Sequence, residues 1–144
     1  MLLSIRQAKM DDVDALLVLT AQLGYQSTRC ELANRLEVIL SSDKHRALVF
    51  QNNETLVVGW IVIEQRITLE GGDRAEITGL VVHDLARGQG VGKQLVQAAI
   101  SWAHSKGLNK VVVSSNAQRE GSHHFYKQMG FKQKKTSIQY IKYI

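Results

Sequence analysis

Three glycines at alternate positions, Gly88, Gly90 and Gly92, follow an apolar run at residues 80–82. An amphipathic pattern that predicts a helix comes directly after them. Glycines let backbone N–H groups approach an oxygen closely, and the unpaired N–H groups at a helix N-terminus carry partial positive charge. A strand, a glycine-rich turn and a helix in this order therefore predict a site for an anion. A pyrophosphate is the group that fits such a site best.

The spacing of the glycines decides between three kinds of phosphate-binding loop. A P-loop would need glycine at 87 and serine or threonine at 94, where this chain has Arg87 and Gln94. A dinucleotide fingerprint needs Gly-x-Gly-x-x-Gly, but Gly88, Gly90 and Gly92 leave one residue in each gap. The remaining pattern is Arg/Gln-x-x-Gly-x-Gly/Ala, which runs from Arg87 to Gly92. It resembles the acetyl-coenzyme A (acetyl-CoA) loop of the Gcn5-related N-acetyltransferases (GNAT).

A second motif lies further along the chain. The β-branched run at 111–113 is typical of a buried parallel strand. The stretch from Asn116 to Phe131 then resembles the Asn-x-x-(small)-x-x-Phe-Tyr-x-x-x-Gly-Phe segment of the same family, with Ser122 as a small residue. The two motifs stand in the family's order, separated by one helix and one strand. On this basis the chain is identified as a member of the GNAT superfamily, of the bacterial small-molecule amine N-acetyltransferase type.

The resemblance implies an enzyme that moves the acetyl group of acetyl-CoA to a primary amine of a small molecule by direct transfer. Acetyl-CoA is the expected co-substrate, and no metal is expected. The loop would hold the pyrophosphate, while the backbone at 80–82 would pair with the pantetheine arm and polarise the thioester carbonyl. The residues expected to bind the coenzyme are Leu80, Val81, Val82, Arg87, Gly88, Gln89, Gly90, Val91, Gly92, Lys93, Asn116, His123 and Tyr126.

Tyr126 and Glu76 are the catalytic candidates that the resemblance implies. Tyr126 stands where family members often place a tyrosine that protonates the coenzyme thiolate; free phenols and thiols have pKa values of about 10 and about 8.5. Glu76 stands as far before the loop as the catalytic glutamate of Gcn5-type acetyltransferases, so it is the candidate base, acting directly or through water. Water alone is the open alternative, because many family members use only water. Glu64 is an alternative base, because strand alternation places it on the face of Trp60 and Val62.

The adjacent histidines His123 and His124 do not form a metal site. Neighbouring side chains point about 100° apart on a helix, so the two cannot chelate one ion. Similar sequence patterns occur in small-amine and aminoalkylphosphonate N-acetyltransferases. By that resemblance, His123 is expected to touch the coenzyme or to order its helix.

Length and composition fit a single N-acetyltransferase domain over residues 1–144. Of these residues 44% are hydrophobic and 22% are charged, which is ordinary for a globular domain. The one cysteine, Cys30, allows no intramolecular disulfide. Early acidic residues argue against a secretory leader, and no apolar run approaches membrane-spanning length. We therefore expect a cytoplasmic protein.

Hydrophobic periodicity predicts a mixed α/β (α+β) fold with a central, mostly antiparallel sheet, one parallel crossover and flanking helices. The expected order is β-α-α-β-β-β-α-β-α-β. Strands are expected at 3–8, about 47–51, 56–65, 75–83, 111–113 and 131–143, with turns at 52–54 and 71–73. Helices are expected to begin at Asp11 or Asp12, at the capping box of Thr28 and Glu31, at Val91, and before Tyr126.

Charge is unevenly distributed along the chain. Residues 1–84 contain 8 basic and 12 acidic residues, a net charge of −4, whereas residues 85–144 contain 10 basic residues and one acidic residue, a net charge of +9. The basic part is the part expected to bind a coenzyme with three phosphates, so nucleic acid is not needed to explain it. The family resemblance implies that the first two helices and the turn near Gly71, which belong to the acidic part, help wall the acceptor cleft. An acidic wall is expected to favour a cationic amine.

Two alternatives to a small-molecule enzyme stay open. One is a protein or peptide N-acetyltransferase. The other is a non-catalytic module on the same fold that binds acetyl-CoA or nucleic acid. The expected partners are a small-molecule amine, no nucleic acid and no membrane, with a homodimer as the candidate assembly.

Overall fold

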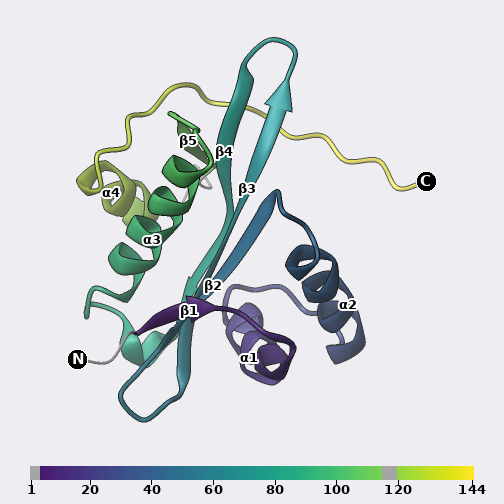
Figure 1. The fold of residues 1–144 in the computed structure, drawn as a ribbon, viewed down its shortest axis with the longest axis vertical. Helices are drawn as coiled ribbons and strands as arrows, with labels where there is room; N and C mark the ends of the chain where they lie inside the picture. Colours follow the sequence, from purple (N-terminus) through teal and green to yellow (C-terminus); the bar gives the residue numbers. More distant parts are fainter. Residues whose placement is uncertain (1–3, 115–119) are drawn as a thin grey trace. The chain divides into compact units, whose positions relative to one another are not determined.

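The structure, a computed structural model, describes residues 4–114 and 120–144. It divides into two compact units, Met1–Val113 and Ser114–Ile144, which are described separately (Figure 1). The single domain expected over residues 1–144 stays a prediction. The elements of the first unit are β1 (Ile5–Gln7), the 3-10 turn η1 (Met10–Asp12), α1 (Val13–Gln22), α2 (Arg29–Leu40), β2 (His45–Gln51), β3 (Val57–Thr68), β4 (Gly72–Val82), the 3-10 turn η2 (Asp84–Ala86), α3 (Val91–Ser105) and β5 (Val111–Val113).

A five-stranded sheet in the order β1-β2-β3-β4-β5 forms the centre of the first unit. β1 to β4 pair antiparallel in chain order, and β5 runs parallel to β4, with Ala75 opposite Val111. A parallel pair needs a crossover connection, which α3 supplies between β4 and β5. The expected mostly antiparallel sheet with one parallel crossover is confirmed.

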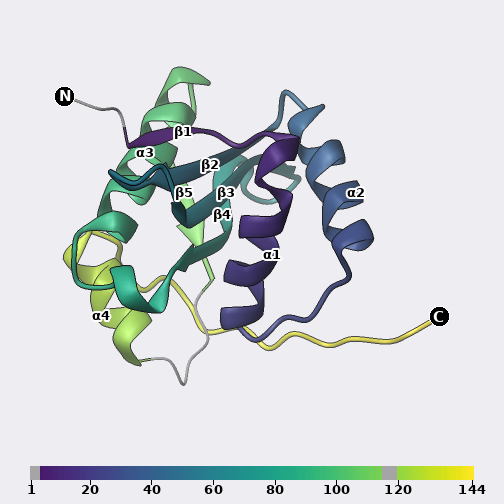
Figure 2. The ribbon, with the colours of Figure 1, turned by 90° about the horizontal axis from the view of Figure 1, so that it is seen from below.

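Helices cover both faces of this sheet (Figure 2). α1 and α2 lie on one face, where Trp60 and Val62 of β3 pack against an apolar cluster that includes side chains of both helices. Because successive strand side chains point to opposite faces, Ile61 and Ile63 of β3 point to the face covered by α3, and both are fully buried. β3 is therefore apolar on both sides, as a strand covered on both faces must be.

The start of α2 matches its sequence signal. The Glu31 N–H donates to Thr28 Oγ1 at 3.1 Å, and the Thr28 N–H donates to Glu31 Oε1 at 2.8 Å. This reciprocal pair is the capping box expected from the spacing of the two residues, and it satisfies two N–H groups that the helix itself leaves without partners. The bonds with Thr28 hold the pKa of the Glu31 carboxyl below its usual value.

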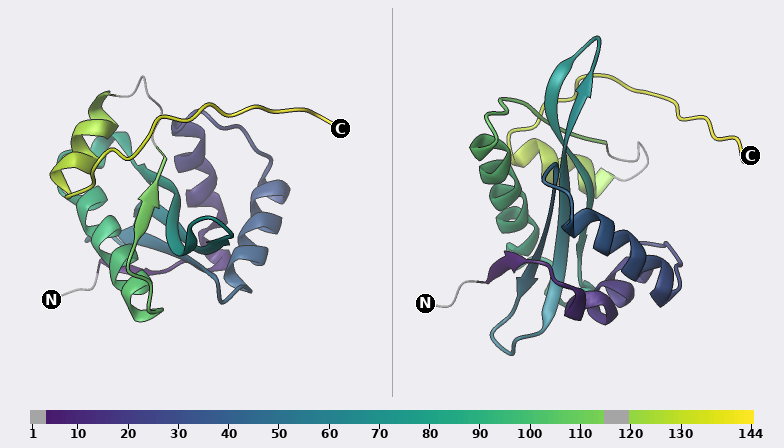
Figure 3. Two further views of the ribbon diagram at one scale, coloured as in Figure 1. Left: turned by 90° about the horizontal axis from the view of Figure 1, so that it is seen from above. Right: turned by 45° about the vertical axis from the view of Figure 1, so that its right-hand side comes forward.

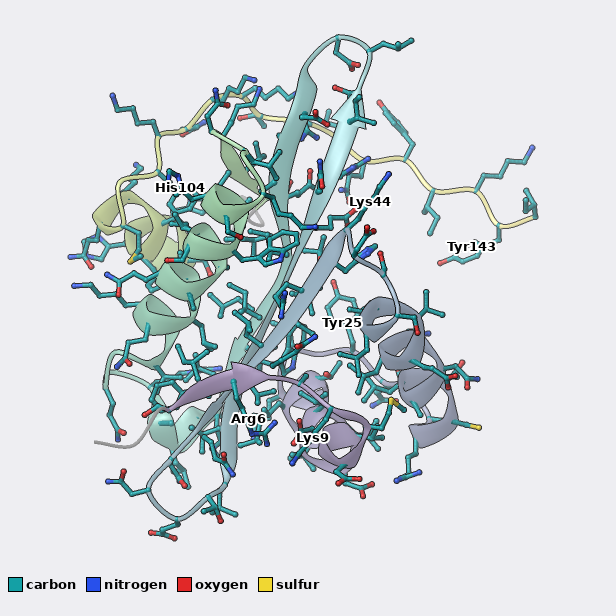
Figure 4. The ribbon with its side chains drawn as sticks, in the orientation of Figure 1. Arg6, Lys9, Tyr25, Lys44, His104 and Tyr143 are labelled. Atoms are coloured by element: carbon teal, nitrogen blue, oxygen red, sulfur yellow. The ribbon has the colours of Figure 1, made fainter. Side chains whose placement is uncertain are left out.

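The start of α1 is held differently from the sequence expectation. Asp12 occupies the N-cap position of α1, but its carboxylate makes no capping bond there. It accepts two hydrogen bonds of 2.8 Å from the Arg6 guanidinium of β1 and one of 2.9 Å from the Lys9 N–H. The hydrogen bonds from Arg6 are the main reason that the pKa of this buried carboxyl lies below its usual range. Arg6 and Lys9 lie where β1 leads into α1 (Figure 4), so the pair ties the first helix to the sheet edge.

β3 and β4 form a long hairpin whose tip projects beyond α1, α2 and α3 (Figure 3). The turn was expected at 71–73, but β4 already begins at Gly72, so the turn lies at 69–71. The Gly71 N–H donates to Thr68 Oγ1 at 3.0 Å, and Gly72 adopts a positive φ of 72°. The chain thus reverses two residues earlier than predicted, and the hairpin is longer.

The second unit contains α4 (Glu120–Gln128) followed by a tail, residues 131–144. Gly130 has a positive φ of 92° just after the helix, and the Phe131 N–H donates to the Tyr126 carbonyl at 3.0 Å. The strand expected over 131–143 is wrong, because the tail forms neither helix nor strand. Its residues alternate as a strand would, but a strand also requires the backbone of a neighbour. None of the backbone bonds described within the second unit gives the tail such a neighbour.

Candidate functional site

The glycine-rich loop connects the end of β4 to the start of α3. It begins at His83, whose Nδ1 accepts a hydrogen bond from the Leu85 N–H at 3.1 Å, and continues through η2. Gly88 and Gly90 then take positive φ angles of 79° and 81°. Other residues enter this region of backbone space only with strain. The path of the loop therefore requires glycine at these two positions.

The first turn of α3 presents backbone donors that no side chain caps. Gly90 is the N-cap and has no side chain, and no acidic residue lies in the first turn. The Gln94 N–H, which bonds to the Gly90 carbonyl at 3.1 Å, starts the helical pattern, so the N–H groups of residues 91–93 have no partner within the helix. These donors, the helix dipole and the exposed Lys93 together fit an anionic group such as a pyrophosphate.

The position of this helix start is fixed by packing against β3. Val91 and Leu95 are buried on the inner side of α3. A Cβ atom at Gly59 of β3 would lie 3.0 Å from Val91 Cγ1 and 3.1 Å from Leu95 Cδ1. The absence of a side chain at Gly59 lets the helix lie close to the sheet, because any larger residue would push its first turn outward. The geometry of the helix start is thus set by the apolar core beneath it.

β4 has a strand on both sides over only part of its length. It pairs with β5 over residues 75–77, whereas residues 78–82 have β3 on one side and no described strand on the other. Antiparallel residues alternate between bonding to their partner and directing their N–H and C=O away from it. The His83 N–H bonds to the Val58 carbonyl at 2.8 Å, which makes Val82 and Gly59 a non-hydrogen-bonded pair.

The same alternation extends back along β4 to Leu80. Leu80 and Val82 therefore direct their backbone groups toward the open edge, while Val81 directs its own toward β3 and buries its side chain. The Val82 carbonyl accepts a hydrogen bond from Arg87 Nε at 3.4 Å. An extended, amide-containing molecule such as pantetheine can add to such an edge as a further strand. Two of the three residues expected at this contact have backbone groups in position for it.

A β-bulge lies directly before the open edge. The register shifts between Val62 and Ile63 of β3 and leaves Thr78 of β4 without an opposite residue. The next residue, Gly79, is covered by Trp60, since a Cβ atom there would lie 2.5 Å from the indole ring. Trp60 Nε1 is buried and has no hydrogen-bond partner among the described residues. Sequence reasoning missed this contact because it brings a side chain of β3 over the backbone of β4 beside a register shift.

Glu76 and Glu64 stand opposite each other on β4 and β3, so their side chains share one face of the sheet. The Glu76 carboxylate accepts hydrogen bonds from Arg74 Nη2 at 3.1 Å and from Arg66 Nη1 at 3.3 and 3.4 Å. Glu64 forms no ion pair within the described part of the chain. The two arginines were missed from sequence. Each lies two residues from a glutamate on its own strand, so the alternation of the hairpin could have revealed them.

Tyr126 lies in the second unit, near the end of α4. Its ring makes edge contacts with Phe125 and Phe131, at centroid distances of 5.1 and 5.5 Å. Burial raises the pKa of the Tyr126 phenol above its ordinary value. The phenol therefore keeps its proton at neutral pH, as a general acid must.

The structure brings together the expected coenzyme residues of the first unit, because residues 80–82 lead through the loop to residues 87–93. Glu76 lies on the same strand, four residues before Leu80. His123 and Tyr126 belong to the second unit, on α4. Asn116 lies outside the described residues.

Other features of the described residues lie away from this site. A groove of about 470 Å³ follows α2, and one of about 480 Å³ lies between β1 and α3; neither is lined by an expected site residue. Within residues 4–114 and 120–144, no group of three or more His, Cys, Asp or Glu side chains could hold a metal ion. In the same residues, no helix is both long and apolar enough to cross a membrane.

A family model described as the acetyltransferase (GNAT) family matches residues 13–131. The chain belongs to this family. This GNAT chain is 33% identical over 135 residues to the aminoalkylphosphonate N-acetyltransferase of Salmonella typhimurium, an alignment that covers 90% of the chain and 84% of the relative. The expected family and its acetyl-CoA-dependent N-acetyltransferase chemistry are therefore confirmed.

Solved structures share the fold over nearly the whole chain. AAC(6')-Iy, in complex with the bisubstrate analog CoA-S-monomethyl-acetylneamine, superposes with a TM-score of 0.87 at 22% identity and covers 97% of both chains. A structure described as a transcriptional regulator from Bacillus halodurans superposes with a TM-score of 0.84 at 26% identity, over 95% of this chain and 97% of its own. The expected GNAT-like fold class is confirmed by these neighbours.

The conformation of the loop generates a first prediction. The substitution Gly90→Val should abolish acetyl-CoA binding while the protein stays folded, because a side chain would block the approach of a phosphate to the backbone donors. Gly107→Val is the matched control, since Gly107 also has a positive φ, 78°, and open space around its Cβ position, but lies at the other end of α3. Calorimetric titration should show lost binding only for the first variant. Unchanged affinity in a folded Gly90→Val protein would contradict the assignment of the loop.

Proposed function

We propose that this GNAT chain transfers the acetyl group of acetyl-CoA directly to the primary amine of a small molecule. The observation that carries the proposal is the open edge of β4, which runs through the glycine-rich loop into the uncapped N-terminus of α3. The edge fits the amides of a pantetheine arm, and the helix start fits a pyrophosphate. The aminoalkylphosphonate activity named for the Salmonella relative supports a small acceptor.

Bound acetyl-CoA supplies an acetyl group activated as a thioester. Transfer forms a bond from the amine nitrogen to the carbonyl carbon and breaks the bond from that carbon to sulfur. A backbone N–H at the β4 edge, from Leu80 or Val82, donates to the carbonyl oxygen as negative charge develops there. Tyr126 gives its proton to the departing sulfur, and Glu76 or a water molecule takes the proton from the amine nitrogen.

Replacing the phenol of Tyr126 tests its role as the acid. Tyr126→Phe should lower kcat by about 10²–10⁴, the usual contribution of a positioned proton donor, with little change in acetyl-CoA affinity. The ring packing against Phe125 and Phe131 is kept by the substitution. Tyr143→Phe, at an exposed tyrosine in the tail, is the control and should leave kcat unchanged. Wild-type turnover in Tyr126→Phe would remove Tyr126 from this role.

The proposed base, Glu76, is held between two guanidinium groups. Its contacts with Arg66 are 3.3 and 3.4 Å long, and Arg66 is about half exposed, with 46% of its side-chain surface accessible. Such an exposed contact is weak, so an acceptor or a water molecule can compete for the carboxylate. Arg74 is more enclosed and orients the group. Glu64, opposite on the same face, is the alternative base.

The pH dependence of acetyl transfer separates these candidates. Below the pKa of the acceptor amine most acceptor is protonated, so a base must remove a proton before the nitrogen can react. Glu76→Gln should therefore reduce kcat/KM most at low pH, and the loss should shrink as pH rises through the pKa of the amine. Glu64→Gln is the matched comparison. If only Glu64→Gln shows this profile, Glu64 is the base. If neither variant shows it, water is the base. Either result contradicts the role of Glu76.

A cationic acceptor is the finer part of the proposal. Of the acidic residues in 1–84, several are bound to arginines or cap a helix: Asp12, Asp14, Glu31, Glu76 and Asp84. Others form no ion pair among the described residues: Asp11, Glu37, Asp43, Glu54, Glu64 and Asp73. The unbalanced negative charge belongs to this second group. Glu64 belongs to this group and lies on the same face of the sheet as the proposed base. Its negative charge there would attract an ammonium group.

A screen of amines with thiol release as readout tests the charge of the acceptor. A polyamine or another multiply charged amine should give a higher kcat/KM than an aminoalkylphosphonate. Its kcat/KM should also fall as salt rises, because exposed charges are screened beyond about 8 Å at physiological ionic strength. The charge argument would be overturned if the best acceptor were anionic, or if kcat/KM did not change with salt concentration. The acetyltransferase assignment would stand in either case.

The same screen addresses the alternatives to a small-molecule substrate. If peptides released thiol and small amines did not, the chain would be a protein or peptide N-acetyltransferase. If acetyl-CoA bound without any acceptor being modified, the chain would be a non-catalytic module on the same fold. The edge and loop described above serve binding in each case, so only turnover distinguishes them.

A further inference from the structure

A groove of the first unit lies between β1 and α3, away from the residues expected to bind the coenzyme. The two elements lie side by side (Figures 1 and 2). The volume of the groove is about 480 Å³, within the range of about 300–1,000 Å³ that is usual for small-molecule sites. Residues of β1, β2 and α3 line it, and all of them belong to the first unit. The groove is therefore a feature of that unit alone.

Strand alternation determines which side chains line the groove. Arg46 of β2 stands opposite Ile63 of β3, whose side chain points to the face covered by α3. Side chains of opposite residues share a face, so Arg46 points to the α3 face as well. Leu48 lies two residues further along β2, and Gln7 of β1 stands opposite it, so both are on this face too. The groove thus lies on the α3 face of the sheet, at its β1 edge.

The guanidinium of Arg46 has few partners. Its Nη1 donates to Gln7 Oε1 at 3.0 Å, and Arg46 forms no ion pair within the described part of the chain. The Nε atom is enclosed and has no hydrogen-bond partner among the described residues, whereas the Nη2 atom makes no hydrogen bond to them and is not enclosed. A charged donor withdrawn from water without an acceptor costs free energy. An anion in the groove would offset this cost and could accept a hydrogen bond from Nη2.

The other residues that line the groove define the kind of anion. Arg6 borders it, but its guanidinium is bound by the Asp12 carboxylate at 2.8 Å, so Arg46 supplies the one positive charge left to balance. No acidic residue is among the described residues that line the groove. Apolar residues make up half of the lining: Ile5, Leu48, Ala98 and Trp102. One negative charge on an apolar body fits this combination.

We propose that the groove binds a small carboxylic acid with an apolar body, at a site separate from that of acetyl-CoA. The carboxylate accepts a hydrogen bond from Arg46 Nη2, and the body packs against Leu48 and Trp102. α3 takes part in both sites, through its first turn at residues 91–93 and through residues 98–102 at the groove. Residues 80–82 and 87–93 do not line the groove, so the acid and the coenzyme can bind together. The proposal does not depend on acetyl transfer.

Small probes test the charge and the apolar body of the ligand. In calorimetric titrations of the full chain, phenylacetate or hexanoate should bind. Phenylacetamide lacks the charge and acetate lacks the apolar body, so each should bind about tenfold more weakly or worse. The proposal would be overturned if neither acid bound, or if phenylacetamide or acetate bound as tightly as the acids do.

Variants of two lining residues locate the bound acid. Arg46→Gln should weaken its binding about tenfold or more, the usual contribution of a charge-assisted hydrogen bond. Ser101→Trp places a large ring in the groove from an exposed position of α3 and should block binding. It decides the matter if Arg46→Gln does not fold. Arg35→Gln, the same charge change at an exposed arginine of α2, is the control and should bind the acid as the wild type does. Wild-type affinity in a folded Arg46→Gln or Ser101→Trp protein would contradict the site.

Competition with the coenzyme separates this site from the one described above. The affinity for the acid should be the same with and without saturating acetyl-CoA. Gly90→Val, which is expected to lose the coenzyme, should still bind the acid. Displacement of the acid by acetyl-CoA would place it at the coenzyme site and would overturn the proposal. Failure of the proposed acetyl transfer, in contrast, would leave acid binding unchanged.

Discussion

Everything at the candidate site depends on an unequal pairing of β4. This strand has β3 beside it throughout, but β5 only at residues 75–77. The bulge at Thr78 changes the register at the point where β5 ends, and from there to Val82 one edge of a central strand is open. Open backbone in the middle of a sheet would be costly unless something pairs with it. The feature is therefore an incomplete sheet that a substrate with amides of its own can complete.

The apolar core sets the geometry of this edge and of the loop beyond it. Gly59 leaves room for Val91 and Leu95, which place the first turn of α3 against β3. Gly79 leaves room for Trp60, which covers the strand on the other face. Both glycines act through close packing rather than through backbone freedom. The donors at 91–93 and the open edge at Leu80 and Val82 are thus positioned by apolar side chains that pack against the two glycines.

Sequence alone predicted the features whose structure is determined by residues that are neighbours along the chain. The loop, the capping box at Thr28 and the crossover between β4 and β5 each depend on a short stretch with a local physical signal. It was insufficient where residues distant in sequence meet. The contact of Arg66 with Glu76 and the indole over Gly79 both join β3 to β4 and follow from the register of the two strands, which the sequence pattern alone does not specify. The cytoplasmic location stays a prediction.

The failure of the last expected strand has a related cause. Residues 131–143 alternate like a strand, and periodicity reports which faces of an element could be buried. It does not report whether a neighbouring backbone is present, and a strand exists only as one member of a pair. Residues 131–144 belong to the second unit, which is described apart from the sheet of the first. A strand pattern therefore predicts the faces that an element can bury, whereas the pairing that makes it a strand depends on backbone elsewhere in the fold.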